Sequence, residues 1–87
     1  MAGLSHINDL MNDDILEAIR LADSGEWAKA HELVDGKSDK LSHWLHANLH
    51  REEGDDWNAG YWYKRAEKPV SSLGFAEERK QIRASIA

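Results

Sequence analysis

The sequence repeats a short pattern at a spacing of 29 residues, and this repeat restricts the chain to a stack of paired segments. The repeated residues are a leucine, two alanines and a glycine: Leu16, Ala18, Gly25 and Ala30 recur as Leu45, Ala47, Gly54 and Ala59. In both copies an acidic residue follows the glycine, which is typical of a turn between two helices. Repeats of about 20–50 residues with this layout are typical of stacked helical hairpins.

Helical periodicity extends over most of the chain. One proline and six glycines interrupt it, and no segment shows the sustained two-residue alternation of a strand. The apolar spacing and the capping residues predict helices over residues 13–24, 26–35, 39–53, 55–67 and 75–86, with a short turn of helix before Asn12. We therefore expect an all-α domain with a first hairpin over residues 12–36, a second hairpin over residues 38–69 and a C-terminal helix over residues 74–87.

The stretch from His43 to Pro69, HWLHANLHREEGDDWNAGYWYKRAEKP, resembles a tetratricopeptide repeat. A small residue, Ala47, lies seven positions before the Gly-acid turn, and the alanine, aromatic and alanine positions of the family follow as Ala59, Tyr63 and Ala66. The resemblance implies two tetratricopeptide-like antiparallel hairpins, although the spacing here is 29 residues where the family has about 34. The chain also resembles a group of short bacterial proteins with similar HWLHANLHREEGD-type segments, a likeness that implies no activity.

The tetratricopeptide resemblance also implies a place for a partner. In such arrays the first helices of successive repeats line a concave groove, and four residues would face it here: Trp44, Asn48, Arg51 and Glu52. Arginine and asparagine in a groove could hold a peptide carboxylate through charge-assisted hydrogen bonds. On the outer side of the fourth predicted helix, three residues are expected to form an exposed aromatic patch: Trp57, Tyr61 and Arg65. For both sets the alternative is ordinary packing or solvent exposure.

Histidines are the residues best suited to carry chemistry. A stripe along the third predicted helix contains His43, His46 and His50 at positions i, i+3 and i+7, with Glu53 at i+10. His46 and His50 are one turn apart and can bind a single metal ion such as zinc. His43 could be a third ligand only if the first turn distorts, because i and i+7 are about 10 Å apart along an ideal helix axis. Metalloproteases have a glutamate after the first histidine; here that position is Ala47, so their motif is absent.

The same histidines have a structural alternative. Their rings could pack against Trp62 and Tyr63 in the seam between two helices, with their nitrogens bonded to tyrosine hydroxyls, Glu53 or backbone. His31 is expected to face solvent or to be partly packed. Neighbouring acids such as Glu77-Glu78 point about 100° apart on a helix, so we expect them to be caps and solvated faces rather than a general acid–base pair.

Composition excludes several classes of function. Without cysteine the chain has neither a disulfide framework nor a cysteine-ligated metal site. A net charge of −5 argues against general nucleic-acid binding. No apolar run approaches about 18 residues, so we expect no membrane span. The N-terminal MAGLSHINDL lacks the order of a secretory signal, which favours the cytoplasm. Neither a cysteine nucleophile nor a GxSxG or phosphate-binding glycine loop is present, so an enzyme is the minority hypothesis.

Charge is unevenly distributed along the chain. Residues 1–56 hold 13 acids and 5 bases, whereas residues 57–87 hold 3 acids and 6 bases. A chain with oppositely charged ends could pair head to tail with a second copy and form a homodimer. The sequence therefore favours a small non-catalytic interaction module that binds a peptide or protein partner or itself. The alternative is a metal-binding protein, or a metal-dependent hydrolase, built on His46 and His50.

Overall fold

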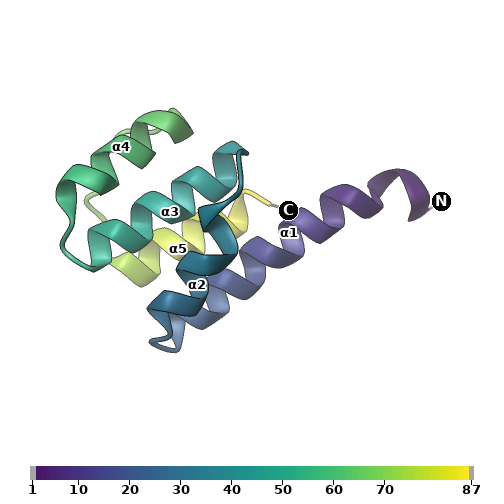
Figure 1. The fold of residues 1–87 in the computed structure, drawn as a ribbon, viewed down its shortest axis with the longest axis horizontal. Helices are drawn as coiled ribbons and strands as arrows, with labels where there is room; N and C mark the ends of the chain where they lie inside the picture. Colours follow the sequence, from purple (N-terminus) through teal and green to yellow (C-terminus); the bar gives the residue numbers. More distant parts are fainter. Residues whose placement is uncertain (1, 87) are drawn as a thin grey trace.

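The structure is a computed structural model that describes the backbone of residues 2–86 and the side chains of residues 12–86. The described chain contains five helices and no strand (Figure 1), so the predicted all-α class is confirmed. The helices are α1 (Ala2–Asp23), α2 (Trp27–Asp35), α3 (Lys40–Glu52), α4 (Asp56–Ala66) and α5 (Phe75–Ala84). Within the described residues, none of these helices combines the length and the apolar character needed to cross a membrane.

The two hairpins, α1 with α2 and α3 with α4, turn in the same way. Gly25 and Gly54 both have φ of +86°, a left-handed conformation that glycine adopts without strain. In each turn the N–H of the acid after the glycine donates to the carbonyl five positions earlier. These bonds join Glu26 to Leu21 at 2.8 Å and Asp55 to His50 at 2.9 Å. Both turns therefore carry the long hydrogen bond of a Schellman motif, and the 29-residue repeat is visible in the backbone.

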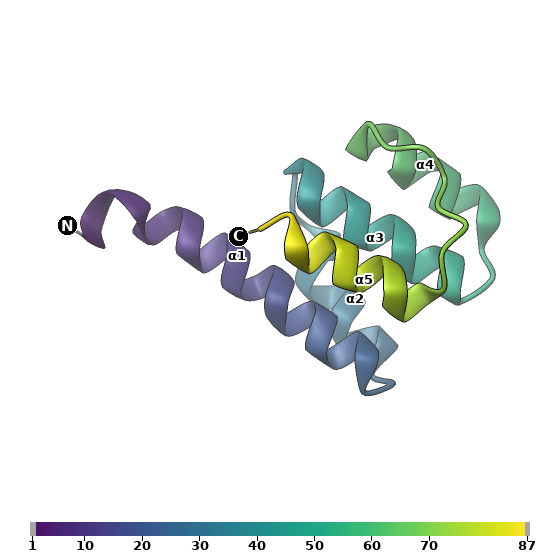
Figure 2. The same cartoon turned by 180° about the vertical axis from the view of Figure 1, so that it is seen from behind.

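Side-chain caps begin α3 and α4. The sequence predicts Ser38 or Asp39 as the cap of α3 and Asp55 as the cap of α4, and the structure has Asp39 and Asp55. Asp39 accepts a hydrogen bond from the backbone N–H of Ser42 at 3.0 Å, and Asp55 accepts one from Asn58 at 3.2 Å. The start of α1 differs from the prediction. We expected only a short turn of helix before Asn12, but α1 begins at Ala2. The helix is continuous because no glycine or proline lies between residues 4 and 24 to end it. Figures 1 and 2 show this part of α1 extending beyond the other helices.

α3 is the central helix of the fold. Every residue from Ser42 to His50 is buried, because α1, α2, α4 and α5 all pack against α3. The four alanines of the repeat are also buried, and their small side chains allow the helices to approach closely: Ala18, Ala30, Ala47 and Ala59. This pairing of helices agrees with the expected helical hairpins.

α5 packs against α1 and α3, the first helices of the two hairpins (Figure 2). This is the side on which the tetratricopeptide resemblance implies an open concave groove. Ile82 is the fully buried apolar residue that anchors α5, and the rest of its buried face is formed by two charged residues, Glu78 and Arg79. The C-terminal helix therefore fills the place of the predicted groove.

Candidate metal centre

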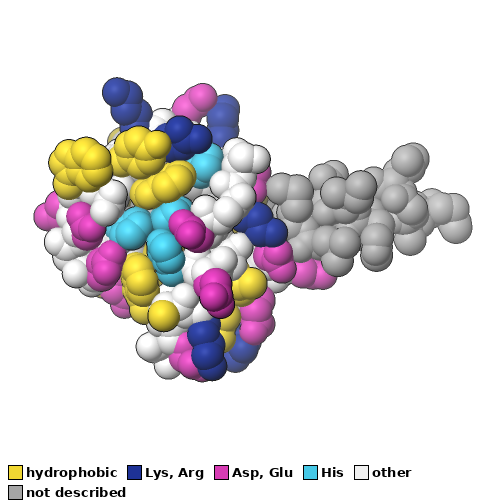
Figure 3. Space-filling view, viewed as in Figure 1, with side chains coloured by type: hydrophobic (Ala, Val, Ile, Leu, Met, Phe, Trp, Pro, Cys, Tyr) yellow, Lys and Arg dark blue, Asp and Glu magenta, His cyan; other side chains and the backbone are white. Residues whose placement is uncertain are grey.

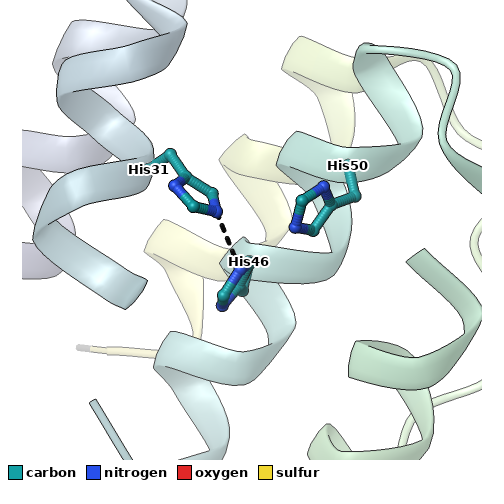
Figure 4. Close-up of side chains that lie close together, drawn as sticks. All are labelled: His31, His46 and His50. Atoms are coloured by element: carbon teal, nitrogen blue, oxygen red, sulfur yellow. Dashed lines mark hydrogen bonds between the residues drawn. The ribbon is translucent and has the colours of Figure 1, made fainter. Parts of the chain in front are cut away.

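Three histidines from two helices converge between α2 and α3 (Figure 4). His31 comes from α2, and His46 and His50 come from successive turns of α3. Nε2 of His31 lies 3.0 Å from Nε2 of His46. One ring nitrogen from each of the three histidines lies within 4.8 Å of the other two. With this spacing the three ring nitrogens lie close enough together to be ligands of a single metal ion.

Aromatic rings surround the cluster and restrict how its imidazoles can turn. Trp62 of α4 stacks on His46 with ring centroids 3.9 Å apart, and Trp27 of α2 stacks on His31 at 4.8 Å. Trp27 is itself fixed, because its Nε1–H donates to the backbone carbonyl of Leu49 at 2.6 Å. Figure 3 shows histidine side chains grouped at the surface among hydrophobic and acidic ones. The cluster is therefore held firmly and still reaches solvent.

Burial favours the neutral form of two of these imidazoles, those of His31 and His46. It lowers the pKa of His46 from 6.5 to about 4, and the neighbouring His31 and His50 add to the effect because two positive charges would repel. Burial is also the main cause of the lowered pKa of His31, which the carboxylate of Asp35 partly opposes. A neutral imidazole has a free lone pair, which is the form that binds metal ions.

His50 is oriented by a carboxylate. Its Nδ1 lies 2.6 Å from Oε1 of Glu53, and because a carboxylate only accepts hydrogen bonds, Nδ1 carries the proton. Nε2 of His50 is then left with the lone pair. A histidine that donates one N–H to a carboxylate and binds metal through its other nitrogen is a common arrangement in metal sites. Nδ1 of His46 is buried and has no hydrogen-bond partner among the described residues.

The predicted histidine stripe is only partly reproduced. His46 and His50 lie together as expected, and Glu53 contacts His50. His43 lies outside the cluster; its ring packs at 5.1 Å from Trp62, and its pKa is lowered mainly by burial. The predicted packing of histidines on Trp62 is therefore present, and it coexists with the cluster.

His31 is the member of the cluster that sequence reasoning missed. We expected it to face solvent or to be partly packed, and it is half-buried against His46. A signal was present, since His31 lies one turn after Trp27 and one turn before Asp35, so that α2 carries its own i, i+4 series of polar and aromatic residues. This spacing would predict that His31 lies beside His46 only if the face of α2 that meets α3 were known.

The four residues predicted to line an open groove are occupied within the chain. Glu78 of α5 is fully buried and accepts hydrogen bonds from side chains of α3 and α4. Its donors are Trp44 at 2.9 Å, Asn48 at 2.8 Å, Arg51 at 2.9 Å and Tyr63 at 2.7 Å. A buried carboxylate requires such partners. The expectation of a solvated Glu78 is therefore wrong.

Arg79 completes this network on the next position of α5. Its guanidinium is buried and donates to Asp23 at 2.7 Å, to Asn48 at 3.0 Å and to Glu52 at 2.6 Å. All four predicted groove residues thus bond to Glu78 or Arg79 of α5; Trp44 and Asn48 are buried, and Glu52 is exposed. The prediction of an open groove at these residues is wrong because the charged face of α5 covers them.

The predicted aromatic patch on α4 is exposed. Trp57 is 78% exposed and Tyr61 45% exposed, and their rings lie nearly parallel with centroids 6.3 Å apart. The guanidinium of Arg65 lies 5.6 Å from the Tyr61 ring. The location of this patch agrees with the prediction, whereas a partner for it stays a prediction.

Comparisons of this chain with protein-family models, with curated proteins and with solved structures found no match. The tetratricopeptide resemblance therefore stays a prediction, with which the hairpin packing agrees.

Proposed function

We propose that this protein binds a divalent transition metal ion, with zinc as the first candidate, through His31, His46 and His50. The observation that carries the proposal is the convergence of three ring nitrogens within 4.8 Å of one another. Zinc–nitrogen bonds of about 2.0–2.1 Å place tetrahedral ligands roughly 3.3 Å apart. The 3.0 Å between the Nε2 atoms of His31 and His46 is close to this value, and a metal bound by both would replace the hydrogen bond that now joins them.

The chemistry of the donors supports the same proposal. Imidazole nitrogen suits zinc, cobalt, nickel and copper, whereas calcium and magnesium prefer oxygen ligands. Burial lowers the pKa of His31 and of His46, which favours their neutral form, and Glu53 fixes the tautomer of His50. If the rings only packed against one another, their nitrogens would not need to lie close together. Nor would Nδ1 of His50 need a carboxylate partner such as Glu53.

The test is the response of the melting temperature to zinc after treatment with a chelator. A ligand at 100 times its Kd stabilises the folded state by about 2.7 kcal/mol, so zinc should raise the melting temperature of the wild-type protein by several degrees. We expect the zinc-induced shift to be lost in His31→Ala and in His46→Ala. His43→Ala is the matched control, because it removes a buried histidine of the same helix from outside the cluster. Equal shifts in all variants, or no shift in the wild type, would contradict the proposal.

A second candidate is the binding of a protein partner or of a second copy, and it is favoured by the exposed rings of Trp57 and Tyr61. Large aromatic side chains on a surface are typical of interfaces. Light scattering on the wild-type protein and on Trp57→Ala tests the homodimer form of this idea. A dimer that dissociates in the variant supports it, and a wild-type monomer at high concentration counts against self-association.

A further inference from the structure

Each of the two helices at the candidate centre contributes a pair of metal-binding residues one turn apart. α3 supplies His46 and His50, and α2 supplies His31 and Asp35. Residues at i and i+4 lie on the same face of a helix, so the four side chains of two packed helices can surround one point. Asp35 lies at the end of α2, with its Oδ1 at 4.0 Å from Nε2 of His46.

The surroundings of Asp35 leave its carboxylate available. Its side chain is 65% exposed, and the contact with His46 is the only ion pair or hydrogen bond found for it among the described residues. Asp35 is also the last residue of α2, where a negative charge is unfavourable beside the partial negative charge of the helix C-terminus. A cation between Asp35 and the histidines would offset this repulsion. Asp35 lies outside the group of ligand atoms within 4.8 Å of one another, so its exposed side chain would turn toward the histidines to bind the metal.

We infer that Asp35 is the fourth ligand of the metal, so that the centre is a closed three-histidine, one-carboxylate site that fastens α2 to α3. This inference rests on the proposed function. Structural zinc sites have four protein ligands, whereas catalytic sites keep one position for water or substrate. A closed site assigns the metal a role in holding the two hairpins together, and it argues against the metal-dependent hydrolase.

α2 is the helix that gains most from such a link. It has nine residues, and among these only Ala30 and Val34 are buried apolar residues. Its N-terminus begins after Glu26, which makes no side-chain capping bond. Short helices depend on tertiary contacts, because nucleation costs more than a few backbone hydrogen bonds return. Metal bound through both His31 and Asp35 would therefore raise the stability of α2 more than that of the other helices.

Cobalt(II) provides the test, because its visible absorption reports the number and kind of ligands. We expect the wild-type protein to give the intense bands of four-coordinate cobalt and to show no change when azide is added. Loss of a residue that only orients a ligand weakens metal binding by about 10–100-fold, and Asp35→Ala should weaken cobalt binding by more than this. The cobalt spectrum of Asp35→Ala should also change when azide is added. Asp35 is exposed, so this variant should fold. Glu32→Ala is the matched control, since it removes an exposed acid from the same helix.

Hydrogen exchange adds a readout of the link itself. Cobalt or zinc should slow exchange of the α2 amides in the wild type and in Glu32→Ala, and this protection should be lost in Asp35→Ala. If the wild-type cobalt complex binds azide and Asp35→Ala retains full affinity, the fourth-ligand inference fails while the three-histidine site stands. If cobalt and zinc do not bind the wild type at all, the proposed function fails and this inference fails with it.

Discussion

α3 carries buried polar side chains on two sides, and the two sides differ in how their hydrogen bonds are satisfied. On the α5 side, both oxygens of the Glu78 carboxylate accept hydrogen bonds, and all of the donors come from this chain. On the α2 side, the three histidines share one short nitrogen–nitrogen contact, and Nδ1 of His46 has no partner among the described residues. A satisfied network has no unpaired donor or acceptor, whereas an incomplete one retains buried polar atoms that still lack a partner. We therefore assign the first network to the fold, and we propose binding only for the second.

This contrast also explains why charged residues can form the inner face of α5. Glu78 contacts Arg51, and Arg79 contacts both Asp23 and Glu52, so each buried charge has an opposite charge beside it. Buried pairs of this kind stabilise a fold little compared with apolar packing, but the loss of one partner is costly. Apolar packing of Ile82 alone would allow α5 to dock on α1 and α3 in several orientations. The hydrogen bonds of Glu78 and Arg79 restrict it to one.

The largest expected effect follows from removing the centre of the satisfied network. Glu78→Ala leaves Arg51 without its buried counter-charge and leaves Trp44 and Tyr63 without an acceptor. We expect it to lower the free energy of unfolding by about 3–5 kcal/mol. Urea unfolding followed by far-UV circular dichroism measures this loss. Glu78→Gln keeps an acceptor and should lose less. If Glu78→Ala unfolds at the same urea concentration as the wild type, the structural role of Glu78 is contradicted.

Acid should destabilise the histidine side of α3. The pKa of His46 is lowered by burial to about 4, whereas an unfolded histidine titrates near 6.5. Stability is therefore complete above pH 6.5 and is lost as the pH falls from 6.5 towards 4, because the unfolded chain takes up the proton first. This difference corresponds to about 3 kcal/mol for His46 alone. The titratable groups that act on His46 are His31, His43, His50 and Asp35, and of these Asp35 alone favours its protonation.

Urea unfolding between pH 7.5 and 4, in the presence of a chelator, measures this dependence. His46→Asn cannot be protonated in this range and should show a flatter profile than the wild type. The difference between the two profiles isolates the histidine from the carboxylates that also titrate in acid. Parallel profiles would show that His46 is not buried as a neutral ring.

Sequence reasoning worked where the determinants are local. The helices and their caps at Asp39 and Asp55 depend on residues within one or two turns, and the matched glycines fix both hairpin turns. The pairing of His46 with His50 is likewise a property of one helix. For these features the sequence contains all the necessary information.

The remaining features depend on packing between helices. The face of α5 that carries Glu78 and Arg79 has the composition of a solvated surface, since hydrophobic periodicity detects apolar residues and not charged ones. Only the donors on α3 and α4 show that Glu78 is buried. In the same way, the role of His31 depends on the rotation of α2 against α3. A single sequence contains no covariation that would pair positions so far apart in the chain.

The sharpest test of the contrast uses two neighbouring residues. Glu53 contacts His50 on the histidine side, whereas Glu52 accepts a hydrogen bond from the buried Arg79 at 2.6 Å on the α5 side. We expect Glu53→Gln to weaken zinc binding by about 10–100-fold and to change the stability of the metal-free protein little. We expect Glu52→Gln to lower the free energy of unfolding by about 1–3 kcal/mol and to leave zinc affinity unchanged. Competitive titration with a zinc-binding dye and urea unfolding of the metal-free proteins measure the two quantities. The two variants differ by one position and remove the same charge. If both weaken zinc binding equally, the loss is due to long-range electrostatics and not to the contact between Glu53 and His50. A selective loss in Glu53→Gln would instead show that the carboxylate acts through the His50 ring.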